Sequence, residues 1–377
     1  MLRLASFLVL ALGTSSLGVQ AFLAPSLASF STSSSTRAAA ASMRTRDKIQ
    51  MAAGEKALII QNQGGGHGEI GYHLALKLAK EKGLKVTVLN DKYNDQKQPF
   101  KSYGDLTAAG VEVLSAELAT ADVKRLLGDQ AYDYVYDNNA KNVELASPVV
   151  NLALSQSWPV KDYVFVSSGG MYKAGDEFPL VEAGAVSDND ARKIELFIQG
   201  SGLPYTFFRP QYIYGPLTSK RDYLDWFFDR ITRGRPVPLP LSGDQFTTLT
   251  HVEDVAALLA SVVDNPKAVN QIFNCATDRY ITFKEVVGLV GRAAGVAQAK
   301  DSIVIYDPVE KKADIPKGWW PFRNTHFNVS PEKAKLLLGW APTHDLAKDL
   351  EEYYRGYVAA GLDKKEISFE VDDKVLS

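Results

Sequence analysis

The sequence predicts an α/β fold, a Rossmann-like doubly wound parallel sheet with a smaller mixed α/β lobe. Short apolar or β-branched runs alternate with helical patterns, at residues 57–61, 85–89, 132–136, 163–167 and 205–209. This alternation is typical of parallel βαβ units. A glycine-rich turn follows the first run, and the alternation weakens around residues 203–216. We therefore expect a Rossmann-like domain over 54–215, a smaller lobe interwoven with it over 216–362, and a C-terminal tail over 363–377.

The first 50 residues have the composition of a targeting segment. Residues 1–46 contain four arginines and no acidic residue, and the apolar core at 7–12 is too short to span a bilayer. Small residues precede Phe22, and a segment rich in Ser, Thr and Ala follows it. The segment resembles the bipartite presequence of algae with complex plastids, with a signal peptide over about 1–21 and a transit peptide over about 22–50. A secretory signal followed by a linker is the alternative.

Composition limits the partners of the remaining chain. Without residues 1–50 it has 37 basic and 43 acidic residues, a net charge of −6, so any nucleic-acid binding must use a local basic face. One cysteine, Cys275, excludes an internal disulfide and a cysteine-rich metal site. No later segment is long and apolar enough for a membrane helix, so we expect no membrane partner.

Helix boundaries follow from capping patterns. The first helix should carry Leu74 and Leu78 on one face and stop at Gly83. Thr250 to Glu253 and Thr282 to Glu285 have the spacing of a capping box. Ser330-Pro331 should open a last helix that Gly339 ends.

The glycine-rich turn predicts a dinucleotide site. Its glycines have G-x-x-G-x-x-G spacing and are Gly65, Gly68 and Gly71. Glycine permits close backbone approach, and the following helix N-terminus offers N–H groups to a phosphate of NAD(P). Asp91, 20 residues past Gly71, is placed to bind ribose hydroxyls. His67 and Glu69 are unusual in such a loop because a carboxylate repels phosphate, so a purely structural turn is the alternative.

A second segment resembles a dehydrogenase active site that is incomplete. Ser167 to Tyr172 looks like the catalytic-serine strand end of the short-chain dehydrogenase/reductase superfamily, with Ser168 and Tyr172 as candidate catalytic residues. That superfamily also needs Tyr-x-x-x-Lys. Lys193 has the expected helical setting, but the residue four before it is Asn189, which cannot donate a proton at neutral pH. NAD(P) could bind, but we do not expect it to turn over.

A polar triplet ends the third run. Asp137, Asn138 and Asn139 lie at the carboxyl edge of the predicted sheet, where open α/β folds place ligands. Carboxylate and amide oxygens suit Mg²⁺, so Asp137 is a candidate metal ligand and all three are candidate catalytic residues. An Asx-rich turn that bonds its own backbone is the alternative.

Two basic segments could contact RNA phosphates, with aromatic rings available to stack bases. The candidates are Lys220, Arg221, Arg230, Arg233 and Arg235 in the first segment, and Lys311, Lys312 and Arg323, beside Trp319 and Trp320, in the second. Most aromatic residues of the first segment share a helical face and should be core. We expect His251 to orient or pack at a helix start and not to act as a ligand. The five histidines, 67, 73, 251, 326 and 344, show no metal-ligand spacing.

Several segments together resemble the chloroplast stem-loop-binding proteins of the extended, atypical short-chain dehydrogenase/reductase superfamily. They are Gly65-Gly66-His67, Asp137-Asn138-Asn139, Phe208-Arg209-Pro210-Gln211-Tyr212, the stretch 226–231, Phe322-Arg323-Asn324 and the tail motifs at 363–367 and 372–374. The likeness runs from about Lys56 to the C-terminus.

The resemblance implies plastid RNA binding with divalent-metal-assisted endonuclease action on stem-loops. It also implies ribosomal RNA, messenger RNA or pre-ribosomal particles as partners, and a homo-oligomer or a heteromer with a paralogue. One rival is an NAD(P)-dependent nucleotide-sugar epimerase or reductase. The other is a non-catalytic ribosome-associated scaffold.

Overall fold

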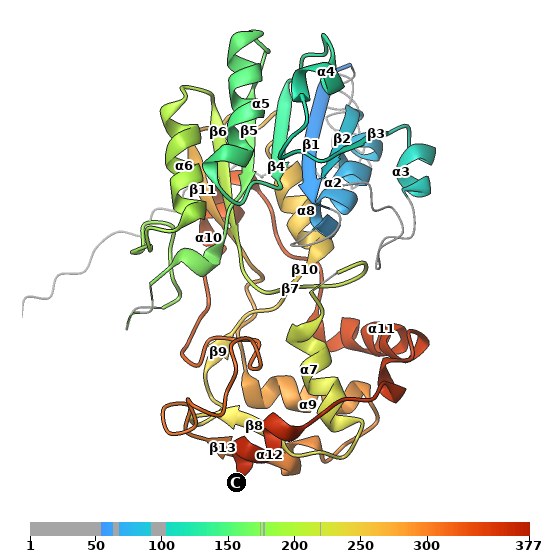
Figure 1. Cartoon of the computed structure of the whole chain (residues 1–377), viewed down its shortest axis with the longest axis vertical. Helices are drawn as coiled ribbons and strands as arrows, with labels where there is room; N and C mark the ends of the chain where they lie inside the picture. The colour runs from blue at the N-terminus through green and yellow to red at the C-terminus, as the bar shows by residue number, and fades with distance from the viewer. Residues whose placement is uncertain (1–53, 63–67, 92–102, 174, 176–177, 219) are drawn as a thin grey trace, which may run out of the picture. The chain divides into compact units, whose positions relative to one another are not determined.

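The structure of the protein is a computed structural model (Figure 1). The structure describes residues 54–62, 68–91, 103–173, 175, 178–218 and 220–377. The predicted presequence and residues 63–67 of the glycine turn, Gly65 among them, lie outside these ranges. No helix among the described residues is long and apolar enough to cross a membrane.

A parallel sheet of seven strands carries the fold, in the order β11-β6-β5-β4-β1-β2-β3 (Figure 1). Its strands are β1 (Lys56–Asn62), β2 (Lys85–Asp91), β3 (Glu112–Ala116), β4 (Tyr134–Asn138), β5 (Asp162–Val166), β6 (Tyr205–Pro210) and β11 (Gln271–Cys275). Every neighbouring pair in this sheet is parallel. The predicted fold class is confirmed. The five predicted runs are strands, whereas β3 and β11 were not predicted as strands.

Both faces of the sheet are covered, as a doubly wound fold requires. Ala57 and Ile59 of β1 face one hydrophobic core, and Leu58 and Ile60 face the other, because successive strand side chains alternate. The first core includes helices α2 (Gly68–Lys80), α8 (Val252–Ala260) and α10 (Glu332–Leu338). The second includes α4 (Val123–Leu127), α5 (Val143–Ser155) and α6 (Asp190–Gly200). Burial on both faces explains the continuous apolar runs in the sequence.

A third core belongs to the smaller lobe. Its helices are α7 (Asp222–Ile231), α9 (Phe283–Ala293) and α11 (Leu346–Ala359). Three two-stranded sheets accompany the main sheet. They pair β8 (Val237–Pro240) with β13 (Ile303–Tyr306), β9 (Phe246–Thr247) with β12 (Ile281–Thr282), and β7 (Ile213–Tyr214) with β10 (Thr250–His251). Shorter elements are α3 (Gly104–Ala108), η1 (Gly169–Met171), η2 (Ala299–Ser302), η3 (Leu362–Lys364) and α12 (Glu370–Leu376).

The chain returns from the smaller lobe to the sheet. Strand β11 pairs with β6, and α8 packs against α2, so residues 252–275 complete the Rossmann-like core. Burial raises the pKa of the Cys275 thiol, which behaves as a small apolar side chain in this core.

The helix caps confirm one predicted box and correct another. Thr282 and Glu285 form the predicted reciprocal capping box at α9. At α8 the cap is His251, whose side chain accepts the backbone N–H of Glu253, and not Thr250. Gly339 ends α10 in the left-handed conformation as predicted, but α11 and α12 follow it.

Candidate functional site

Tyr172 is buried at the carboxyl edge of the sheet. Its hydroxyl donates to Asn274 Oδ1 at 2.7 Å and accepts from Arg209 Nη1 at 3.1 Å. Burial raises the pKa of Tyr172 to about 12, although the charge of Arg209 opposes this shift. A hydroxyl with both roles filled inside the protein cannot readily pass a proton to a substrate.

The Arg209 side chain that contacts Tyr172 belongs to a buried ion pair. Arg209 at the end of β6 donates from Nε and Nη2 to the two carboxylate oxygens of Glu195, at 3.0 and 2.8 Å. Ser167 donates to the same carboxylate at 2.7 Å, and Arg192 does so at 3.0 Å. Arg209 and Glu195 are 2% and 0% exposed. Helix α6 therefore places Glu195 at the sheet edge. We call the group formed by Glu195, Arg209, Ser167 and Arg192 the Arg209–Glu195 network.

The remaining dehydrogenase positions also have structural roles. Asn189, which stands where the resemblance requires tyrosine, caps α6 by accepting the N–H of Arg192 at 3.0 Å. Lys193 is exposed and lies 3.5 Å from Asp190. Ser168 caps η1 by accepting the N–H of Gly170 at 3.1 Å. Ser168, Asn189 and Lys193 therefore do not form the serine, tyrosine and lysine group of a dehydrogenase.

The described part of the glycine turn is a packing turn. A Cβ on Gly71 would lie 1.8 Å from Gln61 Oε1, so the close approach that Gly71 permits is used by a side chain. Gln61 donates to the Tyr103 hydroxyl at 2.7 Å, and Asp91 accepts the N–H of Leu118 at 2.9 Å. Glu69 is buried in the first turn of α2.

Two features of the described residues favour the structural alternative over a dinucleotide site. The buried Glu69 carboxylate at the start of α2 would repel a pyrophosphate, and the Tyr103 hydroxyl contacts Gln61 and Asn90 at the ends of β1 and β2, the edge where open α/β sheets bind ligands. Gly68 opens α2, and Gly65 lies outside the described residues.

Asp137 serves a turn. Its Oδ1 accepts the N–H groups of Asn139 and Ala140 at 3.0 and 2.9 Å, and its Oδ2 accepts the hydroxyl of Tyr163 at 3.2 Å. Burial raises the pKa of Asp137, although these hydrogen bonds oppose the shift. The side chain is 1% exposed. Because both oxygens are engaged inside the protein, this geometry favours the Asx-turn alternative over a Mg²⁺ ligand.

The arginines of the first basic segment are tied to the protein. Arg230 is buried, and its guanidinium donates to both oxygens of Asp372 in α12, at 2.7 and 2.8 Å. Arg233 donates to the carbonyls of Leu362 and Lys365 at 2.9 and 2.7 Å. Arg235 pairs with Asp373. These three fasten the C-terminal segment to α7 and to the turn that follows it, so the geometry gives their prediction as RNA contacts no support.

The two neighbouring cations differ in their availability. Arg221 forms a bidentate pair with Asp225 at 2.8 and 3.1 Å, and its guanidinium lies over the Tyr353 ring. Lys220 is exposed, with its ammonium 4.8 Å from the Tyr223 ring centroid. Lys220 is therefore the member of this segment that the geometry leaves open to a phosphate.

The second basic segment is partly structural too. Arg323 donates to the carbonyls of Tyr172 and Gly170 at 2.9 and 2.6 Å, which fixes the loop at 322–327 over η1. Trp320 is buried, and the Trp319 indole donates to Asp372 at 3.0 Å, so neither is an exposed stacking ring. Lys312 is exposed, and Lys311 reaches the C-terminal helix at the Lys374 carbonyl.

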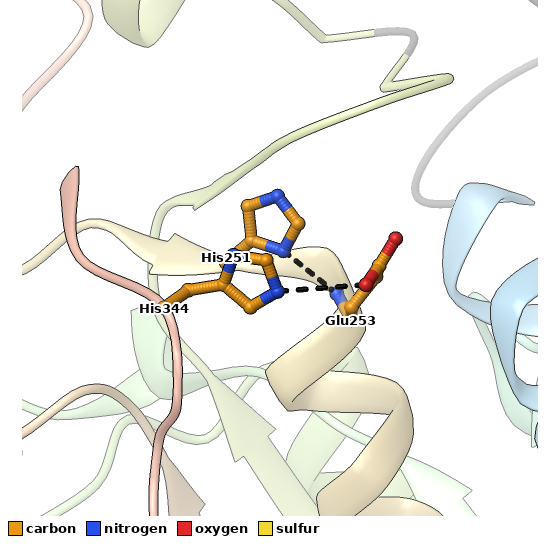
Figure 2. A group of neighbouring side chains, drawn as sticks. All are labelled: His251, Glu253 and His344. Atoms are coloured by element: carbon orange, nitrogen blue, oxygen red, sulfur yellow. Dashed lines mark hydrogen bonds and ion pairs between the residues drawn. The ribbon is translucent and has the colours of Figure 1, made fainter. Parts of the chain in front are cut away.

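Three histidines converge at the start of α8, a grouping that sequence spacing did not predict. The rings of His251 and His344 stack with centroids 3.5 Å apart and planes at 10° (Figure 2). Glu253 Oε2 lies 3.4 Å from His344 Nε2, and Glu253 Oε1 lies 3.9 Å from His73 Nδ1. Burial lowers the pKa of His251 to about 4, and the neighbouring His344 adds to this. His251 caps α8 as an orienting residue, as expected.

Two cavities meet at this histidine pair. One, of about 490 Å³, is lined by Arg221, Glu253 and Tyr353. The other, of about 370 Å³, is lined by Arg279, Leu289 and Arg292. His251 and His344 belong to both walls. Imidazole and carboxylate groups between two open volumes form the part of the described chain best suited to hold a ligand.

Comparison with known proteins places the chain among two groups. The sequence pattern of the NAD dependent epimerase/dehydratase family matches residues 64–276. The chain is also 36% identical over 335 residues to the chloroplast stem-loop binding protein of 41 kDa b from Arabidopsis thaliana, covering 86% of this chain and 85% of that protein.

Solved structures share the fold at low identity. UDP-glucose 4-epimerase from Thermotoga maritima, solved with UDP-glucose, is 22% identical with a TM-score of 0.61, covering 80% of this chain and 99% of that one. An epimerase from Methanothermobacter thermautotrophicus is 20% identical with a TM-score of 0.60, covering 85% and 97%. At this level of identity the likeness establishes the architecture alone.

Proposed function

We propose that this chain, which belongs to the chloroplast stem-loop binding proteins within the NAD dependent epimerase/dehydratase family, is a plastid RNA-binding protein that recognises stem-loop RNA. The observation that carries the proposal is the likeness to the stem-loop binding protein along 86% of the chain. The Arg209–Glu195 network fits this proposal, because it holds the hydroxyl of Tyr172, the candidate proton donor, in structural hydrogen bonds. Nicotinamide turnover is accordingly not expected.

An exposed group of rings supplies a surface for loop bases. Phe178 and Phe246 are 45% and 37% exposed, and His326 stacks on Phe178 with centroids 4.8 Å apart and planes at 13°. His326 Nδ1 accepts the N–H of Phe246 at 3.0 Å, which fixes its ring. Aromatic faces held in this way stack unpaired bases without regard to sequence. Because Arg230, Arg233 and Arg235 are engaged by the C-terminal segment, these rings and the exposed Lys220 and Lys312 are our proposed RNA contacts.

Our proposal does not include cleavage of the bound RNA. The engaged oxygens of Asp137 give no support to Mg²⁺-assisted chemistry at that turn. Our proposal is therefore binding of stem-loop RNA. Ribosomal partners, oligomer formation and the bipartite presequence remain predictions from the sequence.

Fluorescence anisotropy on a hairpin RNA, and on a blunt duplex with the same stem, tests the proposal. We expect tighter binding of the hairpin, and an affinity that falls with salt as counterions are released. The double variant Phe178→Ala/Phe246→Ala should lose ~10-fold or more on the hairpin and little on the duplex, from the usual size of base stacking. Leu336→Ala, which truncates a side chain 78% exposed on α10, is the matched control. Binding of neither RNA at low salt would contradict the proposed function.

A further inference from the structure

The histidine cluster brings together groups that ligate metals. One ligand atom from each of His251, Glu253 and His344 lies within 4.8 Å of the others. Among the residues that the structure describes, it is the one group of three or more His, Cys, Asp or Glu side chains with this spacing. His251 and Glu253 come from the start of α8, and His344 comes from the segment before α11 (Figure 2).

Hydrogen bonds place a lone pair of His251 on the Glu253 side. Its Nδ1 accepts the backbone N–H of Glu253 at 3.2 Å, so the neutral ring carries its proton on Nε2. This is the tautomer that Nδ1 needs in order to bind a cation. A metal at Nδ1 would replace one capping hydrogen bond of modest strength.

The Asp349 carboxylate orients His344 so that its other ring nitrogen also lies on the Glu253 side. Its Nδ1 lies 3.3 Å from Asp349 Oδ2, which also accepts the Tyr214 hydroxyl at 2.7 Å. With the proton on Nδ1, the lone pair of Nε2 faces Glu253 Oε2 at 3.4 Å. Two acceptors at this separation are stabilised by a cation between them. A carboxylate behind a ligating histidine is the usual arrangement in metal sites.

A further histidine has its lone pair turned to the same carboxylate. His73 Nε2 lies 3.3 Å from the Pro216 carbonyl, which can only accept, so Nε2 carries the proton. The Nδ1 lone pair of His73 is then 3.9 Å from Glu253 Oε1. Glu253 thus lies between histidine lone pairs on both of its oxygens.

We propose that His251, Glu253 and His344 hold a divalent transition-metal cation of the zinc class, with Asp349 as a positioning residue. Two imidazoles and one carboxylate suit zinc and its neighbours better than Mg²⁺, which prefers oxygen ligands. Three protein ligands leave a fourth position for water or a substrate, and all three ligands line the cavity of about 490 Å³. The stacked rings must tilt apart on binding, because their in-plane lone pairs run side by side. This site does not depend on RNA binding.

Metal titration of the full chain tests the proposal. The metal-free protein is titrated with Zn²⁺ by calorimetry, and with Co²⁺, whose visible absorption reports tetrahedral N/O ligation. We expect one metal per chain. Glu253→Gln and His344→Gln should each weaken Zn²⁺ binding ~100-fold or more, and Asp349→Asn should weaken it ~10- to 100-fold, the usual effect of losing a partner behind a ligand. Glu144→Gln, which alters an exposed carboxylate of α5 outside the cluster, should leave Zn²⁺ binding unchanged.

The variants are informative because Glu253 is partly exposed and makes no buried ion pair that folding would require. Circular dichroism confirms that each variant is folded, and Zn²⁺ should raise the Tm of the wild-type chain and of Glu144→Gln more than that of any variant of the cluster. Absence of equimolar Zn²⁺ binding would overturn the proposal. Equal Zn²⁺ affinity in Glu253→Gln and the wild type would overturn it as well, since it would place the metal elsewhere.

Discussion

Replacing Glu195 with glutamine should destabilise the fold strongly. Arg209 is 2% exposed, and Glu195→Gln removes the carboxylate that balances the charge of the buried Arg209 guanidinium. Removing one partner of a buried ion pair typically costs about 3–5 kcal/mol. Arg209 would keep its bonds to the Tyr172 hydroxyl and the Glu182 carbonyl, and at most one of its two bonds to the side chain at position 195. The glutamine can still accept one hydrogen bond, so we expect a loss near the lower end, about 3 kcal/mol.

Urea unfolding followed by circular dichroism measures this loss. The double variant Arg209→Met/Glu195→Leu removes both charges and should recover most of the stability, because buried pairs often contribute little net free energy. Arg192→Gln is the control, since Arg192 contacts the same carboxylate from a partly exposed position and should cost less than about 1 kcal/mol. A Glu195→Gln variant within about 1 kcal/mol of the wild type would refute the view that this network is structural.

Three further predictions concern packing, charge and the tail. Gly71→Ala should destabilise by about 1–3 kcal/mol because its Cβ displaces Gln61, whereas Gly356→Ala in α11 meets no atom within 4 Å and should be neutral or stabilising. Burial raises the pKa of Asp162 from 3.8 to about 7, so the folded state binds the extra proton and stability falls as pH rises through this window. Asp162→Asn should therefore raise the unfolding free energy at pH 8 by up to about 4 kcal/mol and have little effect near pH 4; urea unfolding at both pH values checks this. Arg230→Gln should release α12, seen as faster proteolysis of the C-terminus, and leave the salt dependence of RNA binding unchanged.

The sheet was predictable because its signals are local. The runs at 57–61 and 85–89 are apolar because both faces of those strands are buried, and Gly83 and Gly339 end their helices with positive φ as expected. Strand β3 was not predicted from the sequence because Glu112 and its half-buried neighbours lack a continuous apolar pattern.

The site was less predictable because its contacts are distant in sequence. His251 and His344 are brought together by packing between α8 and the segment before α11, so no ligand spacing exists to read. Arg230 and Arg233 looked available for phosphates because their partners lie in the tail, more than 100 residues away. Asp137 could be read as a ligand or a turn from its neighbours alone, and the Tyr163 hydroxyl from the adjacent strand decides for the turn.

The central claim, RNA recognition on a scaffold without dehydrogenase catalysis, is tested most directly by sequencing RNA crosslinked to the protein in isolated plastids. Our account predicts enrichment of plastid transcripts at stem-loops, with crosslinked peptides that contain Phe178, Phe246 or His326. Recovery of RNA no greater than from a non-crosslinked sample, together with sustained NADH or NADPH turnover by the purified protein, would contradict it.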